Sequence, residues 1–136
     1  MTTIFTEIHN LQKPPVYKYF VGNQWLPSAS DKHIEIHSPI DNSIVGIVPS
    51  VTKEEAESAV ESAKNAQKGW EEMLVNERVE IIHKAAALIK ENADILRDLI
   101  ILEIGKPFGE AEEEALRTVD LIDYYAEEGR RLVGDV

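Results

Sequence analysis

The sequence contains no cysteine, which excludes disulfide bonds and cysteine-containing zinc sites within its 136 residues. Basic residues are scarce, since 14 Lys and Arg stand against 25 Asp and Glu, for a formal charge of −11. This acidic excess repels polyphosphates and argues against nucleic-acid binding. No apolar run is long enough to span a bilayer, and residues 1–15 lack the basic and apolar regions of a signal peptide. We therefore predict a cytoplasmic protein with no membrane or nucleic-acid partner.

The length and composition suit a single globular domain. Apolar residues make up 43% of the chain and charged residues 29%, and a domain of this size buries roughly 65–70% of its unfolded surface. Residues 1–15 are polar and end in two prolines, which predicts an irregular N-terminal arm. Residues 16–136 should form the rest of the unit, with hairpins over 16–49 and helices over 52–131.

Two pairs of β-rich segments predict two antiparallel hairpins. Residues 16–26 alternate aromatic and polar side chains around a Gly-Asn pair at 22–23, and both residues tolerate the positive φ of a tight turn. Residues 34–38 and 44–48 flank a segment rich in Pro, Asp and Asn that can form the second turn. Because side chains alternate along a strand, the core side of the second hairpin should carry Ile34 and Ile36.

From residue 52 onward the apolar period changes from two to about 3.6, which predicts helices. Thr52 and Glu55 have the spacing of a capping box and should begin the first helix. One face of this helix predicts close packing because it carries small apolar residues, with a tryptophan near its end: Ala56, Ala59, Val60, Ala63, Ala66 and Trp70.

Three further helices should follow, over about 76–92, 93–103 and 107–131. Gly105 should end the third helix, and Pro107 can occupy the first turn of the fourth. The second helix is expected to bury Val79, Ile82, Ala86 and Ile89. The third has a broad apolar face of Ile95, Leu96, Leu99, Ile100 and Leu102.

The fourth helix is apolar on two sides. One stripe at helical spacing consists of Ala115, Val119, Ile122 and Ala126. Nearly opposite to this stripe lie Arg117, Leu121 and Tyr124. A helix that is apolar on two sides usually packs between two layers, so this pattern predicts a further layer against the second side.

Arg117 is the strongest candidate for a binding residue. It is the only base between Phe108 and Glu128, a segment with eight acids. Two interpretations stay open. Arg117 can form helix-surface ion pairs with Glu113 and Glu114, worth roughly 0.3–0.5 kcal/mol each. Alternatively, its planar guanidinium binds a phosphate or carboxylate of a substrate.

The other polar candidates have simpler interpretations. The glycines and lysine of residues 105–109 do not match a phosphate-binding loop, and a helix end followed by a helix start explains them. His33 and His37 lie about 13 Å apart on a strand, too far to share one metal ion. His83 follows two isoleucines in a helix and is interpreted as a residue at the core boundary. No catalytic constellation is visible in the chain.

Several motifs, taken in order, resemble the N-terminal portion of the aldehyde dehydrogenase superfamily. The opening hairpin carries YFVGNQW at 19–25, followed by SPID at 38–41 and VGIVP at 45–49. A helix ends in tryptophan at residue 70, and Glu-Arg at 77–78 begins the next one. LEIGKP at 102–107 resembles the family's E-T-G-K-P signature, with Ile104 in place of the usual Thr.

Within the superfamily, the proline-rich lead-in at 14–19, Arg117-Thr118 and YAEEG at 125–129 resemble archaeal-type non-phosphorylating, NADP-dependent glyceraldehyde-3-phosphate dehydrogenases. The resemblance implies that Arg117 helps to hold the substrate phosphate. It also implies an α/β fold: two antiparallel β-hairpins and about four amphipathic helices, without the parallel nucleotide-binding sheet. The family's nucleophilic cysteine, catalytic glutamate and nucleotide loop would all lie downstream of this chain.

By resemblance, the complete enzyme is a homo-oligomer that oxidises an aldehyde, glyceraldehyde 3-phosphate first, to the acid with NADP or NAD. Succinate semialdehyde or another small aldehyde is the alternative substrate. The chain alone should be inactive, because it holds no catalytic and no cofactor-binding residue. It either pairs with a C-terminal portion of the enzyme or is a non-catalytic remnant that acts as an interaction module.

Overall fold

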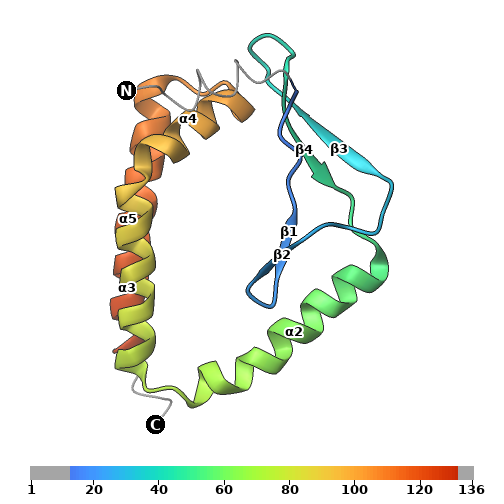
Figure 1. The fold of residues 1–136 in the computed structure, drawn as a ribbon. Coiled ribbons are helices and arrows are strands. Elements are labelled where there is room, and N and C mark those ends of the chain that lie inside the picture. Colours follow the sequence, from blue (N-terminus) through green and yellow to red (C-terminus); the bar gives the residue numbers. More distant parts are fainter. Residues whose placement is uncertain (1–12, 132–136) are drawn as a thin grey trace.

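The computed structural model describes residues 13–131, so most of the predicted arm over residues 1–15 lies outside the described residues. Two hairpins are followed by four helices, which confirms the expected α/β arrangement (Figure 1). In chain order the elements are β1 (Tyr19–Val21), β2 (Gln24–Leu26), β3 (His33–His37), β4 (Ile44–Pro49), α2 (Lys53–Glu72), α3 (Val75–Glu91), α4 (Ala93–Ile104) and α5 (Phe108–Gly129).

Both hairpins turn where the sequence predicts. β1 and β2 pair antiparallel across Gly22 and Asn23, whose φ angles of 57° and 60° match a tight turn with two left-handed residues. β3 and β4 also pair antiparallel, with a register irregularity between Ile36 and His37. The prediction that Ile34 lies on the core side of the second hairpin is wrong. Its side chain is 52% exposed, because no other described element covers it.

The end of the predicted arm is bound to β4. The Tyr17 amide donates to the Ile47 carbonyl at 2.8 Å, and the Ile47 amide donates to the Pro15 carbonyl at 2.9 Å. The Tyr17 ring lies so close to Gly46 that a Cβ there would meet its Cε2 atom at 2.8 Å. Glycine at position 46 therefore allows the chain before β1 to lie against the second hairpin.

The predicted capping box at the start of α2 is present. The Glu55 amide donates to Thr52 Oγ1 at 3.2 Å, and the Thr52 amide donates to the Glu55 carboxylate at 2.8 Å. The same carboxylate accepts from Ser28 Oγ at 2.6 Å and from the Ala29 amide at 2.7 Å. These hydrogen bonds lower the pKa of Glu55, and the bond from Ser28 contributes most. Glu55 thus joins the loop after β2 to the start of α2.

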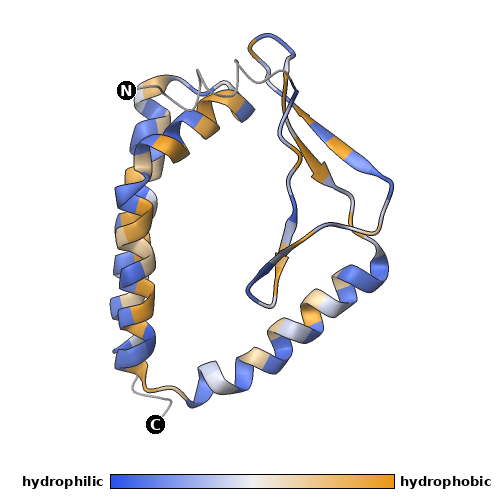
Figure 2. Cartoon of the chain, in the orientation of Figure 1, coloured by the Kyte–Doolittle hydropathy of each residue, from blue (hydrophilic) through white to orange (hydrophobic). Residues whose placement is uncertain are grey.

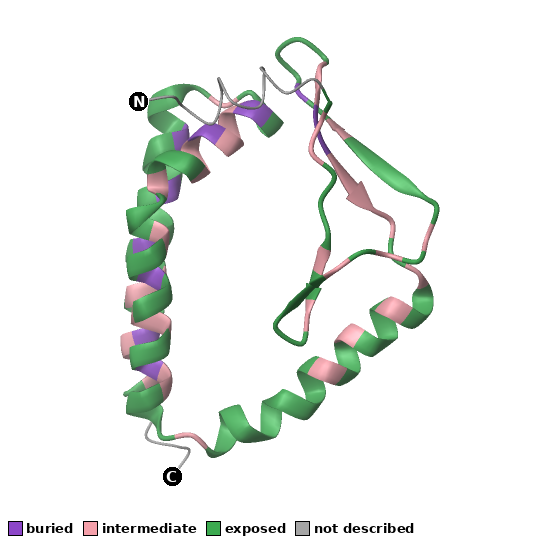
Figure 3. Cartoon of the chain, viewed as in Figure 1, coloured by how far each residue is buried: buried purple, intermediate pink, exposed green. Residues whose placement is uncertain are grey.

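The small-residue face of α2 does not pack in this chain, contrary to the sequence prediction. No residue of α2 is buried, and Val60 is 69% exposed. Figure 3 shows α2 mostly exposed, whereas the buried positions of the helices lie on α3, α4 and α5. The helix forms because its cap and its sequence favour it, but the described chain covers its small-residue face only in part, at Ala59.

The helical core lies where α5 packs against α3 and α4. α5 contributes its predicted stripe at Ala115, Val119 and Ala126, together with Ala111, which lies outside the predicted stripe. The facing helices contribute Val79, Ala86 and Leu102. Ile82, Ile89 and Ile122 are only partly buried. Short side chains on α5 allow the three helix backbones to approach closely.

Gly105 connects the helices to the second hairpin. Its φ of 70° is left-handed, and its amide donates to the Ile101 carbonyl at 2.9 Å to end α4. A Cβ at this position would meet Pro39 Cγ, in the β3–β4 turn, at 3.0 Å. Position 105 therefore favours glycine both for its backbone angle and for this close contact.

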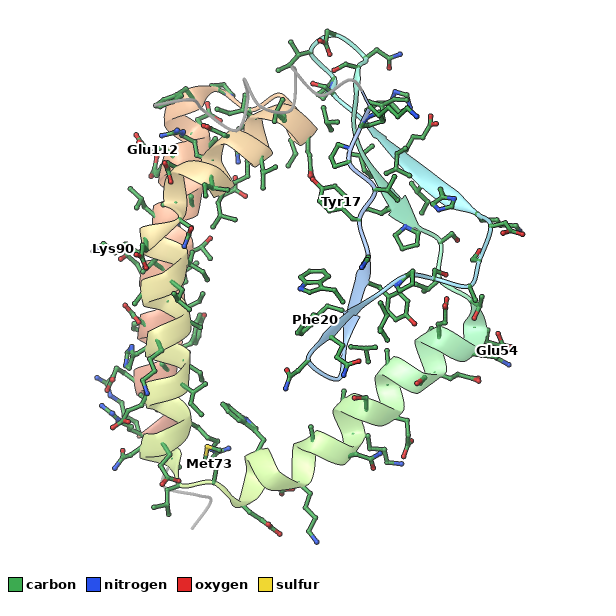
Figure 4. All side chains as sticks on the ribbon, in the orientation of Figure 1. Tyr17, Phe20, Glu54, Met73, Lys90 and Glu112 are labelled. Atoms are coloured by element: carbon green, nitrogen blue, oxygen red, sulfur yellow. The ribbon has the colours of Figure 1, made fainter. Side chains whose placement is uncertain are left out.

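The elements form an open frame in Figure 1, with the hairpins and α2 on one side and α3 and α5 on the other. α2 and α3 meet at a bend near Met73, labelled in Figure 4. Hydrophobic residues in Figure 2 gather on the hairpins, α3, α4 and α5 more than on α2. Among residues 13–131, no helix is both long and apolar enough to cross a bilayer.

Two glycine substitutions should change stability in opposite directions. Gly105→Ala should lower the free energy of unfolding by about 1–2 kcal/mol, because it puts a Cβ into a left-handed position. Gly69→Ala, in α2 with nothing within 4 Å of the added Cβ, should raise helix stability by up to about 1 kcal/mol. Urea unfolding measured by far-ultraviolet circular dichroism tests both. A stabilising Gly105→Ala would contradict the assigned backbone geometry.

Candidate functional site

Arg117 lies on the exposed side of α5, in the third turn of the helix. It lines a hollow of about 380 Å³ with Gly109, Glu112, Glu113, Leu116 and Asp120. The packed stripe on the other side of α5 fixes this orientation, because Ala115 and Val119 face the core. The guanidinium is therefore available to a ligand or to another part of a larger protein.

The predicted ion-pair interpretation of Arg117 is wrong for the described part of the chain, where Arg117 forms no ion pair. Glu114 instead pairs with Lys106, in the segment between α4 and α5. This hydrogen bond is the main reason that the pKa of Lys106 is raised. Lys106 thus takes up one of the two carboxylates that Arg117 was expected to use.

A cluster around Arg97 fixes the start of α5 beside this hollow. Arg97 Nη2 lies 2.7 Å from the carboxylate of Asp98, and Nη1 lies 3.6 Å from that of Glu112. The guanidinium also stacks over the Phe108 ring at 4.5 Å from its centroid. Asp98 is only 7% exposed, and its ion pair with Arg97 compensates for the burial of the carboxylate. One acid of the Arg117 hollow, Glu112, is therefore partly neutralised.

The second apolar side of α5 is open rather than covered. Leu121 is 47% exposed and Tyr124 is 59% exposed. An apolar hollow of about 350 Å³ lies between α3 and α5, lined by Ile82, Thr118, Leu121, Ile122, Tyr125 and Ala126. The second layer that the sequence predicts is thus not part of the described chain. An apolar surface of this kind commonly marks an interaction site.

His83 joins α3 to α5 through both ring nitrogens, a role that its sequence pattern does not predict. Nδ1 lies 2.6 Å from Asp123 Oδ1, and Nε2 lies 2.8 Å from Glu127 Oε1. The bond with Glu127, followed by that with Asp123, raises the pKa of His83, and the same pair lowers the pKa of Glu127. The one available signal was the i, i+4 spacing of the two acids, which places them on one helix face.

The two other histidines of the described chain, His33 and His37, have local partners. His37 Nε2 lies 3.3 Å from the Glu35 carboxylate, and its Nδ1 lies 3.2 Å from the Asn42 carbonyl. His33 Nδ1 lies 3.2 Å from the Asp31 carbonyl. Over residues 13–131 the structure places no group of three His, Cys, Asp or Glu residues where they could hold a metal ion. Arg117 is thus the one predicted site residue, and the described structure brings no catalytic group to it.

A sequence profile described as "Aldehyde dehydrogenase family" matches residues 25–136. The chain belongs to the aldehyde dehydrogenase family. It is 37% identical over 134 residues to an NADP-dependent glyceraldehyde-3-phosphate dehydrogenase of Arabidopsis thaliana, and the match covers 98% of this chain and 26% of that protein. These matches confirm the expectation that the chain resembles the N-terminal portion of this family, and in particular that of its NADP-dependent glyceraldehyde-3-phosphate dehydrogenases.

Two further relatives of this aldehyde dehydrogenase chain indicate its range. A D-glyceraldehyde dehydrogenase (NADP(+)) of Thermoplasma acidophilum is 35% identical over 119 residues, which cover 88% of this chain and 24% of that protein. The crystal structure of lactaldehyde dehydrogenase from Escherichia coli superimposes with a TM-score of 0.87 at 32% identity, covering 90% of this chain and 26% of that one. The chain therefore spans about a quarter of the length of its relatives.

The His83 contacts make the stability of this aldehyde dehydrogenase chain depend on pH. The pKa of His83 is raised above its ordinary value of 6.5 by folding. Its stabilising contribution is therefore fully present below that value and is lost as pH rises through the folded-state pKa. His83→Gln should lower the free energy of unfolding most near about pH 5.5 and much less near about pH 9.

Urea unfolding of the unmodified chain and of the His83→Gln variant, at a series of pH values between these two limits, measures the effect. The matched control is His33→Gln, on an exposed histidine at the start of β3, and the His83→Gln effect is measured relative to it at each pH. A His83→Gln effect that grows with pH would contradict the assigned contacts.

Proposed function

We propose that this chain supplies the N-terminal part of an NADP-dependent dehydrogenase that oxidises glyceraldehyde 3-phosphate to the acid. The main support is the 37% identity, over nearly the whole chain, with a protein named for that reaction. Arg117 adds to it, because the structure leaves this guanidinium exposed and without an internal ion pair in the described residues. A planar guanidinium is well suited to a phosphate group.

Arg117 acts in this proposal as a phosphate-binding residue. The hollow that it lines also carries Glu112, Glu113 and Asp120, and these carboxylates would repel a dianionic substrate. Arg97 offsets one of them through its contact with Glu112. Further cations from the rest of the enzyme would be needed to bind the phosphate tightly. The chain thus contributes one wall of the substrate entrance.

The NADP that this proposal implies has no matching site in the chain. The sequence contains no glycine-rich nucleotide-binding motif and no cysteine. The described residues form only two-stranded antiparallel sheets, not the parallel sheet that usually binds a dinucleotide. In this proposal the chain's own residues support the fold and bind the substrate. Hydride transfer and acyl chemistry are carried out by the rest of the enzyme.

An unphosphorylated aldehyde is the second candidate substrate. The relative from Thermoplasma acidophilum is named for D-glyceraldehyde, which has no phosphate for Arg117 to bind. Succinate semialdehyde stays a third possibility, because an arginine can hold a carboxylate equally well. The homo-oligomeric state and the cytoplasmic location also remain predictions.

A chimera tests the substrate assignment. Residues 1–136 replace the matching quarter of the Arabidopsis thaliana enzyme, and Arg117→Ala is introduced in that chimera. The substitution should raise KM for glyceraldehyde 3-phosphate by about tenfold or more, because it removes a charged hydrogen-bond donor from the phosphate. KM for unphosphorylated glyceraldehyde should change by less than about twofold.

Steady-state kinetics with both aldehydes give the comparison, and Lys90→Ala, an exposed lysine on α3, is the control. Equal effects of Arg117→Ala on the two aldehydes would remove the phosphate-binding role. The unmodified 136-residue chain should show no turnover by itself, since it lacks the family's cysteine.

A further inference from the structure

A hollow with one buried polar group lies at the bend between α2 and α3. Its volume is about 260 Å³, and it is lined by Trp70, Val75, Arg78, Val79, Ile82, Tyr125, Ala126 and Gly129. Most of the lining is apolar, and Arg78 is the one charged residue in it. Its place in the fold is near Met73 in Figure 4, where α2 ends and α3 begins.

Arg78 Nε is the unusual atom of this hollow. It is a buried side-chain donor that has no hydrogen-bond partner among the described residues. A donor on a charged group is unfavourable when it is removed from water without an acceptor. Helix α3 nevertheless holds it there, because the neighbouring Val79 packs into the core at 3% exposure. The site therefore lacks an acceptor oxygen.

The apolar surface around Arg78 is also only partly covered by the described chain. The hollow shares Ile82, Tyr125 and Ala126 with the apolar hollow between α3 and α5, so the two form one continuous surface. Tyr125 is 68% exposed and Trp70 is 38% exposed on it. An apolar surface with one unpartnered donor fits a polypeptide segment that carries apolar side chains and an acceptor oxygen.

The chain's relatives indicate which polypeptide this is. This chain covers 26% of the length of the Arabidopsis thaliana enzyme, so about three quarters of a complete subunit lie outside it. Gly129, the last residue of α5, itself lines the hollow. The chain therefore leaves its last helix beside this surface, and a downstream segment can reach it over a short distance.

We propose that the Arg78 surface is the docking site for a segment of the remaining three quarters of the subunit, and that Arg78 Nε donates a hydrogen bond to an oxygen of that segment. The acceptor is a main-chain carbonyl or a carboxylate. This inference rests on the proposed function only in requiring that the chain be one part of a complete dehydrogenase. It does not depend on the substrate or on Arg117.

The test compares the same substitutions in two proteins, the chimera and the 136-residue chain. Arg78→Met removes the donor and keeps the apolar stem, whereas Arg78→Gln keeps an N–H near the position of Nε without the charge. Arg131→Met is the control, because Arg131 is exposed and its one ion pair within residues 13–131 is with Glu128. Thermal unfolding followed by circular dichroism gives the midpoint for each protein.

In the chimera, Arg78→Met should lower the midpoint by about 3 °C or more beyond the control, because it leaves the acceptor unpaired. In the 136-residue chain, the same change should leave the midpoint unchanged or raise it, because it removes an unpartnered buried donor. This reversal of sign is the specific signature of the proposal.

The Gln variant identifies the acceptor in the chimera. Recovery of nearly the full midpoint indicates a carbonyl, whereas a partial recovery indicates a carboxylate, which needs the positive charge; either supports the proposal. A chimera in which Arg78→Met equals the control overturns it. The proposal is also overturned if Arg78→Met lowers the midpoint of the 136-residue chain and this decrease grows with protein concentration. That result assigns the surface to a second copy of the chain. Neither result affects the Arg117 kinetics, which test the proposed function separately.

Discussion

The close packing of α5 against α3 and α4 is the interaction on which the rest of the structure depends. It is built on short side chains, with Ala111 at 0%, Ala115 at 3% and Ala126 at 4% exposure. Replacing any of them with a long side chain would force the helices apart. This packing also decides which side of α5 is free, and therefore where Arg117 and the second apolar side are presented.

Polar contacts around this core join parts of the chain that the apolar packing does not hold. His83 spans α3 and α5 with a bond at each ring nitrogen, and Arg97 fixes the start of α5 through Glu112 and Phe108. Glu55 joins the loop after β2 to α2. These groups are partly exposed, so each contributes modestly, and they define geometry more than they add stability.

Much of the fold follows from local sequence chemistry, as at the Gly22-Asn23 turn, the Thr52 capping box and the Gly105 helix end. Each of these features is decided by residues within a few positions of one another. The predictions fail where a partner is needed. The α2 face and Ile34 are apolar but exposed, because what would cover them is not among the described residues. His83 and Arg97 depend on side chains brought close by tertiary packing, which a single sequence does not reveal.

The central claim is that α3, α4 and α5 form the core, whereas α2 is to be covered by the rest of an aldehyde dehydrogenase subunit. Amide hydrogen exchange tests this claim most directly. In the 136-residue chain, amides of α3 and α5 should exchange at least about tenfold more slowly than those of α2. In the chimera, α2 should gain protection to a level near that of α5. Exchange from α2 that is already as slow as from α5 in the 136-residue chain would contradict this account.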